Sequence, residues 1–132
     1  MSMRDQILDA DDIVTEVVDM SEFTGWPEKV WVKALEGTER DSYESSMRII
    51  RGEEMIPDLA NIRAKLVVRT LVEEGGTRIF TDDDDGPVGR KSAKALDRLF
   101  DVATRLSGLS KEDVKELAKN SAAAPSGDSI SS

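Results

Sequence analysis

The sequence predicts an α+β domain in which an N-terminal β-hairpin packs against three or four α-helices. Between residues 13 and 35, one segment rich in β-branched residues and one that alternates strictly are separated by turn-forming residues, which is typical of paired strands. Beyond residue 38, apolar residues recur every three or four positions, which is the period of an amphipathic helix. A length of 132 residues favours a single domain.

The hairpin is predicted from Ile13–Met20 and Glu28–Leu35. The second segment alternates strictly, so one face carries valines and an alanine while the other carries Trp31 between two lysines. Gly25 and Pro27 lie between the two segments and predict a longish connecting loop.

The first helix is expected directly after the hairpin. Thr38–Asp41 fits a capping box, and Tyr43, Met47 and Ile50 follow at spacings of four and three residues. We expect Gly52 to end this helix.

A second helix is expected to open at Pro57–Asp58 and to carry an apolar stripe as far as Leu71. The stretch Lys65–Val72 also fits a strand, but the length of the whole pattern favours a helix, which Gly75–Gly76 would stop. Arg78–Phe80 is a short extended segment, and a third strand beside the hairpin is an open alternative there.

The third helix has the clearest pattern, a single stripe formed by Ala95, Leu96, Leu99, Phe100, Ala103 and Leu106. Gly108 follows it where a left-handed cap belongs. We expect Ser110 to cap a fourth helix, with Leu109 packing on Val114.

Composition divides the chain into three parts. Residues 1–12 are expected to be a polar lead-in and residues 13–120 a single globular domain. Residues 121–132 are mostly Ser, Ala, Pro and Gly and are expected to be disordered, because they have little apolar surface to bury.

The composition argues against an enzyme and against a cofactor or metal site. The chain has no histidine, the usual general base near neutral pH, and no cysteine, which excludes thiolate chemistry and disulfides. A net charge of −9 disfavours nucleic-acid binding, because the phosphate backbone repels an acidic protein.

No membrane or secretory segment is expected. No apolar run approaches the roughly 18 residues of a membrane helix. Residues 1–12 contain four aspartates and lack the apolar segment of a secretory signal. The expected location is therefore the cytoplasm.

A segment that imitates a phosphate-binding loop runs from Gly86 to Ser92. It contains glycines, a lysine and a serine, but only two residues separate the glycines, and Arg90 lies between the second glycine and the lysine. The four preceding aspartates would also repel a triphosphate. We therefore reject a nucleotide site.

A second segment, Thr81–Ser92, imitates a calcium-binding loop. Its first and last residues are threonine and serine, where that loop needs an aspartate and a bidentate glutamate. We expect Asp82–Asp85 to form a solvated turn whose charge suits the N-terminus of the next helix. Weak divalent-ion binding at these four residues is left open.

Aromatic residues give the candidate protein-interaction residues, which are Phe23, Trp26 and Trp31. Trp31 lies on the lysine-bearing face of its strand, and large aromatic side chains commonly anchor protein interfaces. The alternative is that a helix of the same chain covers this face, which would make Trp31 a core residue.

The acidic composition also suggests a nucleic-acid mimic that blocks a DNA-binding protein. A mimic needs an uninterrupted row of carboxylates, whereas arginines and lysines are interspersed among the acids here. We therefore favour an ordinary charged surface.

Four stretches, in this order, resemble a known family. They are Lys29–Leu35 leading into Glu36–Glu44 (EGTERDSYE), then Asn61–Val72, then Arg78–Asp82, and then Gly89–Phe100 leading into Ala103–Ser110. Together they resemble the tail assembly chaperones of long, non-contractile-tailed bacteriophages, particularly those that infect actinobacteria. The resemblance covers roughly residues 12–120, and Glu36 stands where the family usually has threonine.

The resemblance implies the function. Such chaperones bind the tape-measure protein in the host cytoplasm, keep it soluble, help recruit tail-tube subunits and leave before the virion is complete. Many copies act on one target, so weak self-association is expected. In many of these phages a frameshift yields a longer product, which would extend the chain from its C-terminal tail.

The family motifs read as packing positions, so no binding residue is transferred from the resemblance. The alternative function is a stable structural component of the virion, such as a small tail or head–tail connector protein.

Overall fold

The computed structural model describes residues 1–57, 60–109, 112–114 and 116. Its main sheet is antiparallel and consists of β1 (Thr15–Asp19), β2 (Lys29–Lys33) and β5 (Leu71–Val72), with β2 in the centre. The α+β class and the N-terminal hairpin are therefore confirmed. In the described part of the chain, no helix is both long and apolar enough to cross a membrane.

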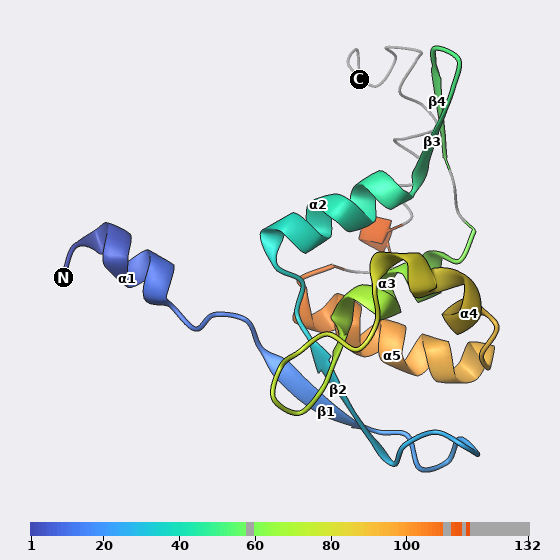
Figure 1. Ribbon diagram of the computed structural model, residues 1–132, viewed down its shortest axis with the longest axis horizontal. Helices are drawn as coiled ribbons and strands as arrows, with labels where there is room; N and C mark the ends of the chain where they lie inside the picture. The colour runs from blue at the N-terminus through green and yellow to red at the C-terminus, as the bar shows by residue number, and fades with distance from the viewer. Residues whose placement is uncertain (58–59, 110–111, 115, 117–132) are drawn as a thin grey trace.

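The helices that follow β2 gather on one side of the sheet, whereas the N-terminal helix stands apart from them (Figure 1). The two that form the centre of the packing are α3 (Ile62–Thr70) and α5 (Ala93–Leu106), and α5 also contacts β1 and β2. α2 (Gly37–Ser46) packs on α3 from one side and α4 (Asp85–Gly89) packs on it from another.

The register of the hairpin decides which side chains face the helices. Val18 lies opposite Val30 and Val17 lies opposite Trp31. Because successive residues of a strand point to opposite faces, the first pair faces the core and the second pair faces away from it. Val18 and Val30 are buried in the core cluster, whereas Val17 is 50% exposed.

The core combines the sheet with α2, α3, α4 and α5. Its fully buried side chains include Val32 from the sheet, Tyr43 from α2, Leu66 and Val67 from α3, and Leu99 and Ala103 from α5. The stripe predicted for α5 is confirmed, because five of its six residues are buried and Leu106 packs partly against the core. Ser92 caps the start of the helix, and Gly108 adopts the left-handed conformation with φ 72° after its end.

The prediction that the first helix runs to Ile50 is wrong. α2 ends at Ser46, and the chain then forms a two-stranded ribbon of β3 (Arg48–Arg51) and β4 (Glu54–Pro57). Gly52 has φ 63° and begins the two-residue turn between them. Ile50 is therefore 72% exposed, not directed into the core.

The cap of α2 also differs from the expectation. Glu36 and Glu39 form the capping box, in place of Thr38 and Asp41. Glu36 takes the N-cap position because its backbone is extended, and its amide donates a hydrogen bond to the Glu39 carboxylate at 2.9 Å.

The second helix starts later and stops earlier than its pattern predicts. Pro57 ends β4, α3 begins at Ile62 after Asn61, and the chain becomes extended at Leu71. The third strand is thus β5, because its pairing with β2 overrides helical periodicity at the end of the pattern. Arg78 adds only an isolated bridge to this edge of the sheet.

Two short helical segments appear where none was predicted. Within the expected polar lead-in, α1 (Met3–Asp9) is capped by Ser2 and contains no buried residue. The acidic run forms a 3-10 turn, η1 (Asp82–Asp84), that leads into α4.

The C-terminal predictions are tested only in part. Residues 112–114 are helical, and Leu109 and Val114 are both buried. Ser110 and the whole of 121–132, including the expected disorder, lie outside the described residues.

Candidate protein-interaction surfaces

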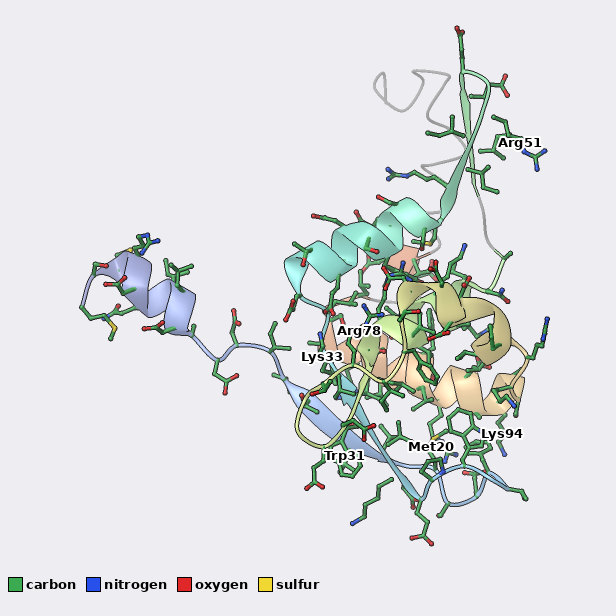
Figure 2. The ribbon with its side chains drawn as sticks, in the orientation of Figure 1. Met20, Trp31, Lys33, Arg51, Arg78 and Lys94 are labelled. Atoms are coloured by element: carbon green, nitrogen blue, oxygen red, sulfur yellow. The ribbon has the colours of Figure 1, made fainter. Side chains whose placement is uncertain are left out.

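The three aromatic candidates do not form one surface. Phe23 packs against the core, and the guanidinium of Arg98 lies 4.8 Å from the centre of its ring. Trp26 also packs partly against the core, from the same loop. Trp31 is half-buried and lies on the side of the hairpin away from α5, whereas Met20 lies between the hairpin and α5 (Figure 2).

We call the side of the hairpin that carries Val17 and Trp31 the outer face. Polar residues surround the apolar pair on both strands, with Thr15 and Asp19 on β1 and Lys29 on β2. An apolar centre with a polar rim is the usual composition of a small protein interface. Of the described strands, none pairs with the free edge of β1, so strand addition there stays open.

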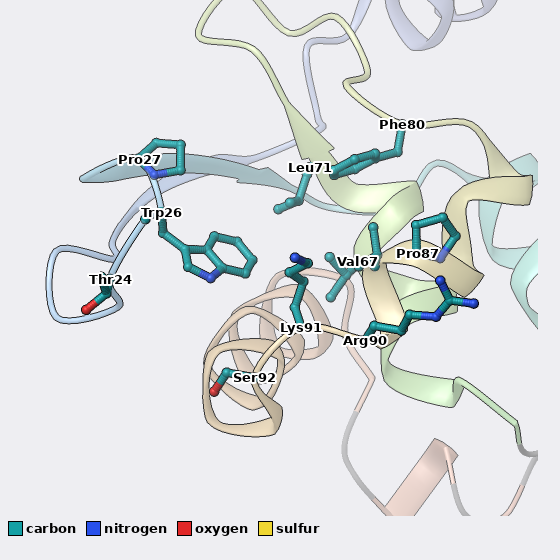
Figure 3. Close-up of a pocket in the computed structure, with 12 residues that line it drawn as sticks. Thr24, Trp26, Pro27, Val67, Leu71, Phe80, Pro87, Arg90, Lys91 and Ser92 are labelled. Carbon is teal, nitrogen blue, oxygen red and sulfur yellow. The ribbon is translucent and has the colours of Figure 1, made fainter.

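An apolar groove lies between the hairpin loop and α4 (Figure 3). Its volume is about 630 Å³, and its apolar lining includes Trp26, Pro27, Val67, Leu71, Phe80 and Val88. Arg90 and Lys91 stand at its border as exposed cations. No pattern in the sequence indicates this groove, because its lining comes from segments far apart in the chain.

The β3–β4 ribbon is a further exposed apolar element. It projects from the end of α2 (Figure 1), and each of its four β3 residues is exposed. An isolated two-stranded ribbon is marginally stable in water, so its exposed isoleucines would gain stability from a partner.

The family-like EGTERDSYE segment has a structural role. Glu39 caps α2 and also accepts a hydrogen bond from Lys33 at 2.5 Å, which ties the end of β2 to the start of α2. Tyr43 is fully buried, and its hydroxyl donates to the carbonyl of Ile62 at 3.1 Å. Burial raises the pKa of the Tyr43 hydroxyl, which therefore stays neutral.

Asp82 links the start of η1 to α2, to α3 and to its own loop. Its carboxylate accepts hydrogen bonds from Arg78 at 2.8 Å and from Ser42 at 3.1 Å, and it lies 3.5 Å from the buried Arg69. Desolvation is the largest single influence and raises the Asp82 pKa, but the two arginines and Ser42 together outweigh it. The pKa of Asp82 is therefore lowered from its ordinary value.

These contacts argue against a calcium loop in this segment. The carboxylate of Asp84 accepts from the Thr81 amide at 2.8 Å and closes the capping box of η1. Among the described residues, no group of three or more acidic, histidine or cysteine side chains could hold a metal ion.

Two carboxylates of the hairpin and its loop pair with cations on α5. Glu16 pairs with Arg105 at 2.6 Å, and Glu22 pairs with both Lys94 and Arg98. The hydrogen bond from Arg98, and then that from Lys94, holds the pKa of Glu22 below its usual range. Paired carboxylates do not form the uncompensated row that a nucleic-acid mimic needs.

The comparison with protein families decides the identity. A model of the phage tail assembly chaperone family matches residues 2–120. The chain belongs to this family. A search of curated proteins and a search of solved structures each found no match.

Membership explains the arrangement described above. The family points to a non-enzymatic role in tail assembly, and the structure offers exposed apolar surfaces for contacts with other proteins. The family-like residues Glu39 and Tyr43 make contacts that stabilise the domain.

Proposed function

We propose that this tail assembly chaperone binds the tape-measure protein transiently, keeps it soluble and helps to recruit tail-tube subunits. The observation that carries the proposal is the match to the chaperone family over residues 2–120. We further propose that the protein acts in the host cytoplasm, leaves before the virion is complete, and makes weak contacts with other copies of itself on the same target.

The physics of the target supports this role. A long helical protein with apolar stripes aggregates when the stripes are exposed, and a partner that covers them prevents this. The net charge of −9 then keeps the coated complexes apart by repulsion.

We assign the tape-measure contact to the outer face of the hairpin, with Trp31 as its anchor. Trp31 is half-buried without belonging to the core, and its neighbour Val17 is 50% exposed. Trp26 adds a second aromatic contact at the groove, and Phe23 supports the loop that carries it.

The test is co-expression with the tape-measure protein, with the soluble fraction of that protein as the measurement. We expect Trp31→Ala to lower the soluble fraction several-fold while the chaperone itself loses about 1 kcal/mol or less of stability. Val14→Ala is the matched control, because Val14 is 57% exposed and lies before β1, outside the outer face, so its truncation should leave the soluble fraction unchanged.

Val32→Ala supplies the contrasting stability control. Val32 is fully buried on the core face of the same strand, so its truncation should cost about 1.5–3 kcal/mol. If Trp31→Ala destabilises the chaperone as much as Val32→Ala does, Trp31 is a core residue and the assignment is wrong.

A further inference from the structure

The helix α1 exposes an apolar face that nothing in the described chain covers. Met3, Ile7 and Leu8 are 76%, 67% and 65% exposed. At 100° per residue these three lie on one side of the helix, and Asp5 and Asp9 lie on the other. A seven-residue helix is unstable alone in water, so this face needs a partner surface.

The groove beside Trp26 has the complementary properties. Its lining is mainly apolar, and the exposed cations Arg90 and Lys91 stand at its border. Within the described residues, neither cation has a carboxylate at ion-pair distance, although Lys94 and Arg98 on the adjacent helix are both paired.

The N-terminal arm and the groove are complementary in charge as well as in hydrophobicity. The arm, residues 1–12, carries four aspartates and one arginine. With the apolar side of α1 in the groove, acidic side chains of the arm come near Arg90 and Lys91. Such pairing at the rim of an interface favours one docking orientation over others.

The geometry places this contact between two copies of the chain. The arm joins the start of β1, whereas the Trp26 loop follows the end of β1, and α1 lies on the opposite side of the molecule from α4 (Figure 1). β1 has five residues and spans roughly 17 Å. The five-residue link Ala10–Val14 spans at most about 17 Å, so it would have to extend fully along the strand merely to reach the groove's end of the hairpin.

We propose that α1 of one chaperone docks in the groove of the next copy. The contact joins two different surfaces, so repeated copies form an open row or a ring. This deepens the proposed function by naming the contact between copies. The contact between copies is tested on the purified chain without any tail protein. A failure of this contact can therefore be distinguished from a failure of tape-measure binding.

The test uses two variants, each with one half of the contact disabled. Ile7→Asp with Leu8→Asp disables the arm, and Arg90→Glu with Lys91→Glu disables the border of the groove. All four side chains are exposed, so both variants should fold. Sedimentation velocity at concentrations on the order of 100 µM, where weak interfaces associate measurably, gives the size of the species that each chain forms.

We expect the unaltered chain to form species that grow with concentration, and each variant alone to remain monomeric. An equimolar mixture of the two variants should stop at the dimer, because only one intact arm and one intact groove remain. The control Lys29→Glu with Arg51→Glu makes the same change in net charge as Arg90→Glu with Lys91→Glu, but at a distance from the groove. This control should still associate. A monomeric unaltered chain, or a mixture without dimer, would overturn the proposal.

Discussion

Asp82 joins parts of the chain that lie up to 40 residues apart. The sequence places it in a run of four aspartates, where all four look equivalent. In the structure, only Asp82 of this run contacts Ser42, Arg69 and Arg78 among the described residues. A pattern of like charges carries no information about which member meets a buried arginine, so the sequence could not single out Asp82.

The lowered pKa of Asp82 gives a pH dependence with a definite sign. A carboxyl whose pKa is lower in the folded state stabilises the protein above its unfolded pKa of about 3.9 and loses that contribution as pH falls through the folded value. The side chain is 45% exposed, so screening limits the effect to about 1 kcal/mol or less.

Denaturant unfolding at pH 6 and at pH 3 measures this contribution. Asp82→Asn should destabilise the protein at pH 6 and should show a smaller loss on acidification than the unaltered chain. Asp83→Asn, which alters an exposed member of the same run, should behave like the unaltered chain at both values. Equal behaviour of the two variants would show that the contacts of Asp82 contribute nothing.

At the scale of elements, α4 and α3 meet at an unusually close approach. A Cβ on Gly89 would lie 2.5 Å from Oδ1 of Asn61, whereas a Cβ on Gly86 would meet nothing within 4 Å. Asn61 has φ 55°, a conformation that glycine adopts readily.

We predict that Gly89→Ala destabilises the protein by about 1–3 kcal/mol through overpacking. Gly86→Ala should be neutral or stabilising, because alanine favours a helix more than glycine does. Adding Asn61→Gly to Gly89→Ala should recover most of the loss, since it removes the clashing side chain. Thermal unfolding of the four chains checks this, and equal losses at positions 86 and 89 would contradict it.

Elements with a long, unambiguous pattern were predictable, and short ones were not. The hairpin and α5 follow from alternation and from a six-residue stripe. The β3–β4 ribbon was missed because Ile50 continued the helical spacing of Tyr43 and Met47, although Gly52 supplied the turn. β5 was read as the end of a helix because its two residues carry no period of their own.

At the scale of the whole molecule, the family could be predicted although the surfaces could not. Four ordered segments indicated a tail assembly chaperone, and the family match over residues 2–120 confirms that identification. The groove lies outside such reasoning, because Trp26, Leu71 and Val88 meet only after the hairpin has packed on α5 and α4 has packed on α3. The segment that we propose for the groove belongs to a second copy of the chain, and a pattern within one chain does not indicate such a contact.

The most direct test of the central claim is to quantify this protein by mass spectrometry in infected cells and in purified virions. A transient assembly factor should be abundant in the infected cell and absent from the finished particle, where the tape-measure and tail-tube proteins are retained. Finding it in virions at a fixed ratio to the tail-tube protein would contradict the transient role. That result would instead identify a stable structural component of the tail or the head–tail connector.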